Sequence, residues 1–336
     1  MLKQDPYRAS GTEQEIPAAS ETGYVVGADI GGTSLRLALA DMNGAVVGKW
    51  KVSTAGIRDP QVVVRLIHDG VEDLLRQNLL SRGSLRAIAA GAPGVTNVDE
   101  GVVIATSYLM GWRDVPLRAL LEAKFGIPAA VENDVNMAAI AESEIGAAQG
   151  VRDFVFLAVG TGIGAGIVLN GRIFHGMNWS AGEIGYMLVP GTSVTPRESG
   201  KPGALESIVG GEGIKAQWQS LWREDLTKLP KNLVATQIFD HALAGDSLAR
   251  TVLHKSAQTL AYAIYNLAVV LNCRLFVLGG SVGMHPALWE ATKDILAERD
   301  TRVQPMLVRS TLGTDAQLNG AIRLALDTAG SRVLST

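Results

Sequence analysis

Apolar residues recur with two different periods along the chain, and their alternation predicts sheets covered by helices. Continuous apolar runs, typical of buried strands, begin at Tyr24, Leu85, Phe154 and Leu275. Between these runs, apolar residues recur every three or four positions, as in helices that pack through one face. The predicted helices cover residues 60–80, 115–125, 135–145, 211–224, 235–243, 247–272, 286–298 and 315–328. This order of elements indicates an α/β protein.

One local plan occurs twice. In each copy an apolar strand leads into a turn of glycines and hydroxyl residues, and a second strand then ends at an Asn-Gly pair. The turns are Asp29-Ile-Gly-Gly-Thr33 and Gly160-Thr-Gly-Ile-Gly164, and the pairs are Asn43-Gly44 and Asn170-Gly171. Asn-Gly predicts a type I′ hairpin turn, whose two central residues need positive φ. The repeat predicts a duplicated fold with a cleft between its halves.

Both glycine turns are suited to hold phosphate, because glycine lets backbone amides approach an anion without obstruction by a Cβ. In the first turn, Thr33 and Ser34 add hydroxyl donors, and Asp29 could orient a hydrated Mg²⁺. Taken alone, this turn is equally well interpreted as an ordinary hairpin with a capping aspartate. The second turn, as far as Gly166, has G-x-G-x-x-G-like spacing but leads into a strand pattern, which argues against a dinucleotide-binding fingerprint.

Carboxylates occur at three further places. Glu132-Asn-Asp134 lies at a predicted strand-to-helix junction, where a carboxylate could accept a proton from a substrate hydroxyl. Helix capping is the alternative interpretation, because Asn and Asp commonly begin helices. Glu183 and Glu206, with an asparagine, suit a polyol, since they accept hydrogen bonds from neighbouring hydroxyls. Without such a partner, each would be a solvated surface glutamate.

The composition excludes several classes of function. Apolar residues make up 47% of the chain and charged residues 19%, as in soluble globular proteins. The net charge is −3 and no dense Lys/Arg run occurs, so we expect no nucleic-acid partner. No apolar run is long enough to span a membrane, and the single cysteine, Cys273, excludes an intrachain disulfide. We therefore expect a cytoplasmic protein whose residues 1–23 form a mobile tail.

Together these motifs resemble the ROK family of sugar kinases and sugar-responsive repressors, within the actin, hexokinase and Hsp70 superfamily. The likeness runs from Tyr24 to about Leu326, with Gly91-Ala-Pro-Gly94 and Gly279-Gly-Ser-Val-Gly283 as further matching segments. It implies an α/β fold of two duplicated actin-like, ribonuclease-H-like lobes, each with a mixed sheet, and an active site in the cleft between them. The small lobe would comprise residues 24–132 and 314–330, and the larger lobe residues 133–313.

The resemblance also implies roles for single residues. Asp134 would be the general base for phosphorylation of a sugar by ATP, with Mg²⁺ accompanying the nucleotide near Asp29. The sugar would be held by Gly94, Asn133, Asp134, Glu183, Tyr186 and Glu206. The nucleotide would be held by Asp29, Gly31, Gly32, Thr33, Arg36, Gly160, Thr161, Gly162, Gly164, Gly279 and Gly280.

The sequence departs from the family pattern at two places. Members usually have a histidine and three cysteines, which bind structural zinc, where Tyr186, Arg197, Ser199 and Ala204 stand. These residues cannot form a tetrahedral zinc site, so we expect no structural zinc. Tyr108 stands where members often carry asparagine.

The leading functional hypothesis is the ATP-dependent phosphorylation of glucose to glucose 6-phosphate. The alternatives are kinases of N-acetylmannosamine, N-acetylglucosamine or fructose, a polyphosphate-using glucokinase, and a non-catalytic sugar-binding relative. A repressor is disfavoured, because residues 1–23 are too few for a winged-helix domain, given a lower bound of roughly 50 residues for a domain. By resemblance we expect a homodimer formed through residues 211–272.

Overall fold

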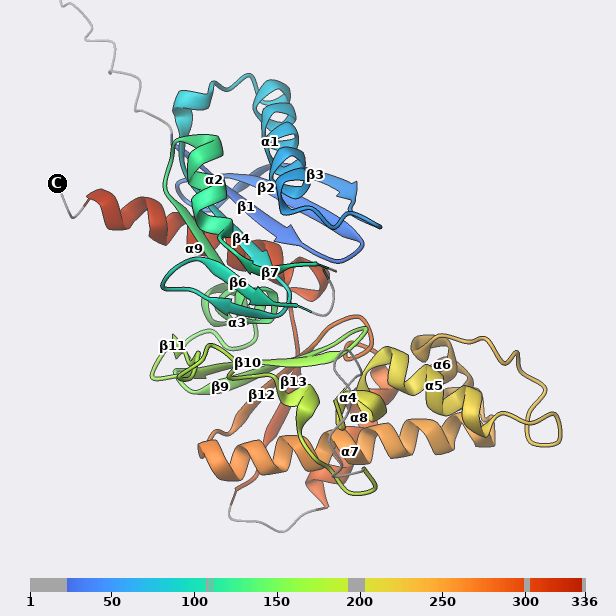
Figure 1. Cartoon of the computed structure of the whole chain (residues 1–336). Coiled ribbons are helices and arrows are strands. Elements are labelled where there is room, and N and C mark those ends of the chain that lie inside the picture. The colour runs from blue at the N-terminus through green and yellow to red at the C-terminus, as the bar shows by residue number, and fades with distance from the viewer. Residues whose placement is uncertain (1–22, 107–108, 110, 193–202, 299–302, 334–336) are drawn as a thin grey trace, which may run out of the picture.

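Each of two lobes is built on a five-stranded mixed sheet (Figure 1). The computed structural model describes residues 23–106, 109, 111–192, 203–298 and 303–333. In the first lobe the strand order is β3-β2-β1-β4-β8. Strands β1, β2 and β3 are antiparallel, whereas β4 and β8 continue the sheet in parallel with β1. Their bounds are β1 Tyr24–Ile30, β2 Ser34–Asp41, β3 Val46–Ser53, β4 Leu85–Ala92 and β8 Ala129–Asn133.

The second sheet repeats this topology. Its order is β11-β10-β9-β12-β13, with β9, β10 and β11 antiparallel and β12 and β13 parallel to β9. The bounds are β9 Phe154–Val159, β10 Ile163–Leu169, β11 Arg172–Ile173, β12 Leu275–Gly279 and β13 Met306–Arg309. The duplication predicted from the two glycine turns is therefore confirmed.

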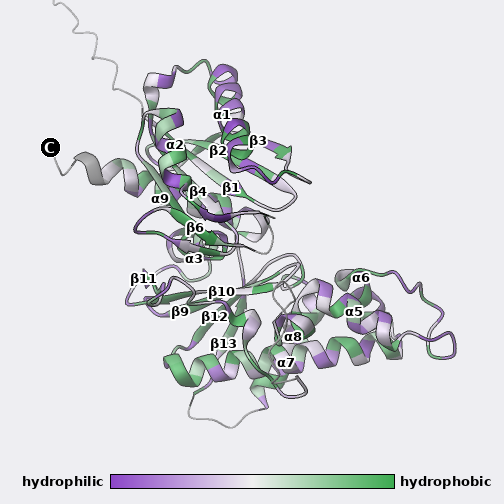
Figure 2. Cartoon of the chain, viewed as in Figure 1, coloured by the Kyte–Doolittle hydropathy of each residue, from purple (hydrophilic) through white to green (hydrophobic). Residues whose placement is uncertain are grey.

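The helices α1 (Pro60–Gln77) and α2 (Leu117–Phe125) cover the first sheet. Asp59 caps the start of α1, because its side chain accepts a hydrogen bond from Gln61 N at 2.9 Å. The inner face of α1 packs Ile67 and Leu74 against strand residues such as Leu37, all fully buried. The outer face of α1 is hydrophilic (Figure 2).

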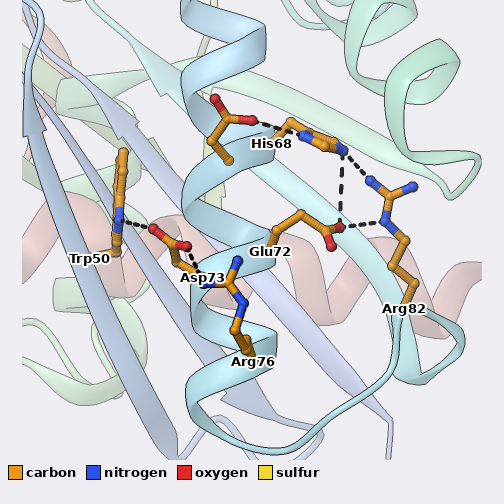
Figure 3. Close-up of polar contacts among 7 residues, drawn as sticks. Trp50, His68, Glu72, Asp73, Arg76 and Arg82 are labelled. Carbon is orange, nitrogen blue, oxygen red and sulfur yellow. Dashed lines mark hydrogen bonds and ion pairs between the residues drawn. The ribbon is translucent and has the colours of Figure 1, made fainter.

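Polar contacts attach the exposed face of α1 to its neighbours (Figure 3). Trp50 of β3 donates from Nε1 to Asp73 at 3.2 Å. Arg82, in the short 3₁₀ helix η1 (Arg82–Ser84), contacts both Glu72 and His68. These contacts fix α1 relative to β3 and to the segment that precedes β4.

The second lobe is richer in helices. The 25-residue α7 runs beneath the second sheet, and α8 packs against it (Figure 1). Trp218 of α5 is fully buried. The helices are α4 Glu206–Val209, α5 Gly211–Leu221, α6 Ala235–Leu243, α7 Ser247–Leu271 and α8 Pro286–Ala297.

Two helices join the lobes. α3 (Asp134–Ile145) packs on β9 and β10 of the second sheet, and α9 (Ala316–Val333) packs on β1 and β4 of the first. The two helices also pack on each other (Figure 1). Glycines permit this close approach: a Cβ at Gly320 of α9 would lie 1.8 Å from the Met137 carbonyl oxygen, and one at Gly166 would lie 2.7 Å from the Ala139 Cβ.

The structure corrects several predictions. Of Asn43 and Gly44 only Gly44 has positive φ (85°), so the first Asn-Gly turn is not type I′. It is a longer turn in which Asp41 N donates to Ala45 O and Gly44 N to Asp41 O. Asn170 and Gly171 both have positive φ, so the second turn is as predicted. The helix predicted from Val115 begins at Leu117, because Pro116 precedes it and Val115 lies in a strand.

A small antiparallel sheet was not predicted. It consists of β5 (Val95–Asn97), β6 (Val102–Ala105) and β7 (Arg113–Val115). These strands are too short to show an alternating pattern of apolar and polar residues. Within the described ranges, no helix is sufficiently long and apolar to cross a membrane.

Candidate active site

Asp134 is the first residue of α3, at the point where β8 ends. Asn133 caps the helix, since its Oδ1 accepts hydrogen bonds from Val135 N at 2.8 Å and Asn136 N at 3.1 Å. Its Nδ2 donates to the Gly94 carbonyl oxygen at 2.8 Å. The capping interpretation of this segment is therefore correct for Asn133, and it leaves Asp134 held at a fixed position beside the cap.

The environment of Asp134 favours the protonated form. Burial, together with the negative charges of Asp29 and Glu183, raises its pKa to about 7, against a smaller opposing effect of the Val135 N–H. One oxygen, Oδ1, accepts from Val135 N at 2.8 Å. A carboxylate whose pKa lies near neutrality can take up a proton and release it at the pH of the cell.

Asp29 is the penultimate residue of β1, beside the first glycine turn. Gly31 N donates to Ser34 O at 2.8 Å to close the turn, and Thr54 anchors it by donating from Oγ1 to Gly31 O at 2.8 Å. Thr33 is exposed at its tip, with Gly32 partly exposed beside it. Burial raises the pKa of Asp29, and the positive charge of Arg36 opposes this effect. This arrangement leaves Thr33 accessible to a ligand.

The prediction that Arg36 contacts the nucleotide is untested, and the structure gives its guanidinium other partners. Arg36 Nε donates to Asp29 Oδ2 at 2.7 Å, and Nη1 donates to the Thr314 carbonyl oxygen at 2.5 Å. Arg36 thus joins the first glycine turn to the segment that leads into α9.

The second glycine turn lies between β9 and β10 and is braced by α4 and α5. Gly211 N donates to Gly160 O at 2.8 Å, and Glu212 N donates to Thr161 O at 3.2 Å. The side chain of Thr161 is exposed, and Gly162 and Gly164 are partly exposed. As predicted, a strand follows the turn rather than a helix.

The Gly279–Gly283 segment adjoins this second turn. Gly280 has φ of 83°, and a Cβ there would lie 2.3 Å from the Val159 carbonyl oxygen. That oxygen accepts from Val282 N and Gly283 N, both at 2.9 Å. Since Val159 immediately precedes Gly160, the structure brings together the two segments predicted to hold the nucleotide in this lobe.

The predicted sugar ligands form a chain of acidic and polar groups. Burial and, to a smaller extent, the charge of Glu206 raise the pKa of Glu183. The negative charge of Glu183 in turn raises the pKa of Asp134. Glu206 accepts from Ile163 N at 3.2 Å, which attaches it to the second glycine turn. Gly94 has φ of 95°, and its carbonyl oxygen accepts the hydrogen bond from Asn133 Nδ2. Tyr186 is 63% exposed, so its side chain points largely into solvent.

Two residues near these acidic and polar groups were not predicted as site residues. His175 Nε2 contacts Glu132 Oε2 at 2.7 Å, although 43 positions separate them in the sequence. Trp179 has a left-handed backbone, with φ of 55°, which is rare for a bulky residue. It lines a cavity of about 20 Å³ together with Asn133, Gly164, Ala181, Gly182 and Glu183. No local sequence pattern marks either residue.

The carboxylates fit a magnesium ion that arrives with nucleotide phosphates, and they do not fit a closed protein cage. Over the part of the chain that is described, no three His, Cys, Asp or Glu side chains gather as metal ligands. Asp29 uses Oδ2 for Arg36, and Oδ1 makes no hydrogen bond to a described residue. Mg²⁺ commonly keeps several waters and takes one or two carboxylates together with substrate phosphates. Asp29 is the residue that would hold it.

The departures from the family pattern are only partly visible. Tyr108, Arg197 and Ser199 lie outside the described residues. Ala204 is buried and has no group that binds metal. The absence of structural zinc therefore stays a prediction from the sequence.

Comparison with known proteins identifies the family. The chain is 35% identical over 267 residues to the protein named Glucokinase from Halalkalibacterium halodurans, which covers 77% of this chain and 80% of that protein. It is 31% identical over 300 residues to the N-acetylmannosamine kinase of Salmonella paratyphi A, which covers 88% of this chain and 96% of that protein.

Solved structures agree with this result. The ROK hexokinase of Thermus thermophilus superposes with a TM-score of 0.74 at 30% identity, over 93% of this chain and 100% of that chain. A ROK glucokinase of Streptomyces griseus, solved with glucose and AMPPNP, shares the fold at 24% identity and a TM-score of 0.75, over 91% of this chain and 100% of that one. The ROK family model matches residues 25–328, and the chain accordingly belongs to the ROK family.

Proposed function

We propose that this ROK-family sugar kinase transfers the γ-phosphoryl group of ATP to O6 of glucose, with Asp134 as the general base. The observation that carries the proposal is the position of Asp134 at the capped start of α3, where burial and the charges of Asp29 and Glu183 raise its pKa to about 7. The relative named Glucokinase, 35% identical over most of both chains, supports glucose as the acceptor.

The proposed roles follow from the geometry. Asp134 accepts the proton of the sugar hydroxyl as its oxygen attacks phosphorus, and Glu183 and Glu206 accept hydrogen bonds from other hydroxyls. Asn133 has already used Oδ1 for the helix cap and one N–H for Gly94, which leaves one N–H for the sugar. Asn133 therefore contributes mainly by fixing Asp134, and only secondarily by direct contact.

The two glycine turns would hold the nucleotide from opposite lobes. Thr33 and Thr161 are exposed at their tips and supply hydroxyl donors, and the segment at Gly279–Gly280 would receive the adenosine side. Magnesium bound with ATP would neutralise charge on the phosphates. Asp29 would orient that ion, and the positive charge of Arg36 opposes the rise in the pKa of Asp29 that burial causes.

A second acceptor, N-acetylmannosamine, is favoured by one comparison. The N-acetylmannosamine kinase of Salmonella paratyphi A is 31% identical and matches over 96% of its length. Tyr186, a predicted sugar ligand, stands where the family pattern has a histidine. This departure is compatible with an acceptor other than glucose.

The test is a coupled ADP-release assay on the purified full chain with glucose, mannose, fructose, N-acetylglucosamine and N-acetylmannosamine. ATP and polyphosphate are compared as donors. The expected result is highest kcat/KM with glucose and ATP. In Asp134→Ala, kcat should fall by roughly 10²–10⁴-fold while glucose still binds in calorimetry.

The matched control is Asp225→Ala, because the Asp225 side chain is 75% exposed. Its kcat should be unchanged. Near-normal turnover of Asp134→Ala would refute the base assignment, and the absence of turnover with every sugar and donor would favour the non-catalytic alternative. Preference for N-acetylmannosamine would replace glucose as the acceptor.

We also propose a homodimer formed through the helices of the second lobe. α7 leaves Val269 and Val270 exposed at 50% and 79%, which is unusual for two adjacent valines in a helix. Sedimentation of the wild type and of Val270→Asp distinguishes the states. A monomeric wild type would contradict the proposal.

A further inference from the structure

His175 connects two parts of the site that are distant in sequence. It follows β11 in the second lobe, and its Nε2 lies 2.7 Å from Glu132 Oε2 at the end of β8. Glu132 is buried, with 6% of its side chain exposed, whereas the His175 side chain is 27% exposed. A buried carboxylate is costly unless it is paired, so this contact satisfies a requirement of Glu132.

The other oxygen of Glu132 holds the junction that carries the proposed base. Oε1 accepts hydrogen bonds from Asn133 N at 2.8 Å and from Asn136 Nδ2 at 2.9 Å. Asn136 lies in the first turn of α3, and Asn133 is its cap. Glu132 therefore binds residues on both sides of Asp134, the backbone of Asn133 and the side chain of Asn136.

The backbone of His175 holds the segment that carries Glu183. The His175 carbonyl oxygen accepts from Ala181 N at 3.1 Å, which closes residues 175–181 into a compact loop. The next residue, Gly182, accepts from Ala165 N at 2.9 Å and has φ of 94°. A Cβ at Gly182 would lie 1.9 Å from Ala165 O, so only glycine fits where the loop meets β10.

The loop and the junction line one cavity. Asn133 and Asn136 of the junction, with Ala181, Gly182 and Glu183 of the loop, surround the space of about 20 Å³ described above. That volume holds about one water molecule. The position of Glu183 relative to Asp134 thus depends on how the loop and the junction are fastened together, and the side-chain contact between them is His175–Glu132.

The charges around His175 favour its protonated form. Glu132 faces it from the end of β8, and Asp99 faces it from the turn between β5 and β6. The hydrogen bond to Glu132 raises the pKa of His175, against the opposing effect of burial. When His175 is protonated, its hydrogen bond to Glu132 is strengthened by charge.

We propose that His175 is a positioning residue, which aligns the sugar ligand Glu183 with the base Asp134 through its bond to Glu132. The inference rests on the proposed function. Loss of the bond should weaken sugar binding and slow transfer, while the nucleotide contacts on the glycine turns should be unaffected. Misplacement of reacting groups by about 1 Å can cost on the order of 10²-fold in rate.

The test compares His175→Ala, His175→Gln and Glu132→Gln with the wild type, using glucose and MgATP. In His175→Ala, KM for glucose should rise on the order of tenfold and kcat should fall, with KM for ATP unchanged. His175→Gln keeps an N–H donor for Glu132 and should restore most of the activity. His254→Ala is the matched control, because His254 is exposed on α7, and it should behave as the wild type.

The outcomes separate this inference from the proposed function. An active wild type whose glucose KM and kcat are unchanged by His175→Ala overturns the positioning role alone. Equal loss of glucose and ATP affinity with a lowered unfolding temperature, unrescued by His175→Gln, also overturns it, because the effect is then a general loss of structure. A wild-type protein without kinase activity would contradict the proposed function. Calorimetric titration of glucose into wild type and His175→Ala then still tests the positioning role, and equal affinities would overturn it.

Discussion

Arg36 and Asp29 stand directly opposite each other in the antiparallel pairing of β1 with β2, and the Arg36 guanidinium lies 2.6 Å from Asp29 Oδ2. The same guanidinium donates to Thr314 O, 278 positions away. A residue predicted from its motif to hold the nucleotide therefore holds another predicted ligand and the segment before α9. We therefore expect Arg36 to act on the reaction through Asp29.

Replacement of Arg36 by methionine should impair the use of MgATP. Burial raises the pKa of Asp29, and without the guanidinium that effect is unopposed, so a larger share of Asp29 is protonated at neutral pH. We expect kcat/KM for MgATP to fall by about tenfold or more. Steady-state kinetics with varied MgATP at saturating glucose measures the effect.

The control for this change is Arg65→Met on α1, a residue exposed to solvent and distant from β1 in the fold. It should leave kcat/KM unchanged. An Arg36→Met enzyme with normal kcat/KM would show that the ionisation of Asp29 does not limit the reaction.

Turnover should increase with pH through neutrality. Asp134 must be ionised to accept a proton, and its pKa is raised to about 7. Below that value kcat should fall by about tenfold for each pH unit, and above it kcat should level off. The profile is measured between about pH 5.5 and pH 9 with saturating glucose and MgATP. A kcat that stays constant down to the acidic end would contradict the assignment.

Asp134→Asn should stabilise the protein while it inactivates the enzyme. A carboxyl group whose pKa is higher in the folded state than in the unfolded chain destabilises the fold above the unfolded pKa of about 3.9. The gain should therefore be absent at strongly acidic pH, grow as the pH rises, and become constant above about pH 7.

Urea unfolding at about pH 5 and pH 8 tests this expectation. We expect the free energy of unfolding to rise by about 1 kcal/mol or more at pH 8, since one pKa unit corresponds to about 1.4 kcal/mol. Asp225→Asn, at an exposed site, should have no effect at either pH. A lower free energy of unfolding for Asp134→Asn at pH 8 would contradict the expectation that the ionised Asp134 carboxylate destabilises the folded state.

Two glycines of α9 provide a test of the contact between the lobes. Gly320→Ala would place a methyl group 1.8 Å from the Met137 carbonyl oxygen of α3. Relief of this clash requires the backbone of one helix to move, which costs free energy. We expect it to lower the free energy of unfolding by about 1–3 kcal/mol. Gly330→Ala meets nothing within 4 Å and should stabilise the helix by up to about 1 kcal/mol. Equal effects of the two substitutions would refute the close packing of α3 on α9.

Much of the fold could be predicted because its signals are local. Asp59 before Pro60 marks the start of α1, and α6 was predicted with the bounds that it has, Ala235–Leu243. The duplicated topology followed from two turns with the same residue types. The three strands at Val95–Val115 are too short for such signals, and the turn at Asn43-Gly44 depends on Asp41, whose carbonyl and side chain both accept from it.

The parts of the site that escaped prediction depend on contacts between distant segments. Glu132 was identified as part of a junction, but its hydrogen-bond partner His175 lies in the other lobe. The sequence around His175 shows no spacing typical of a ligand. Arg36 lies in a motif typical of nucleotide contact, yet its partners are set by the path of the chain into α9. Residue type indicated the chemistry at these positions, and the topology decided which atoms meet.

The location of Asp134 on α3 has a consequence for motion. α3 touches α9 on one side and β10 on the other, through contacts so close that only glycine fits. A rotation of one lobe against the other would have its axis near this helix, and points near an axis travel least. The acceptor hydroxyl would thus be located against a nearly stationary carboxylate, while the glycine turns at Gly32 and Gly162, which we propose hold the phosphates, would cover the larger distance to reach it.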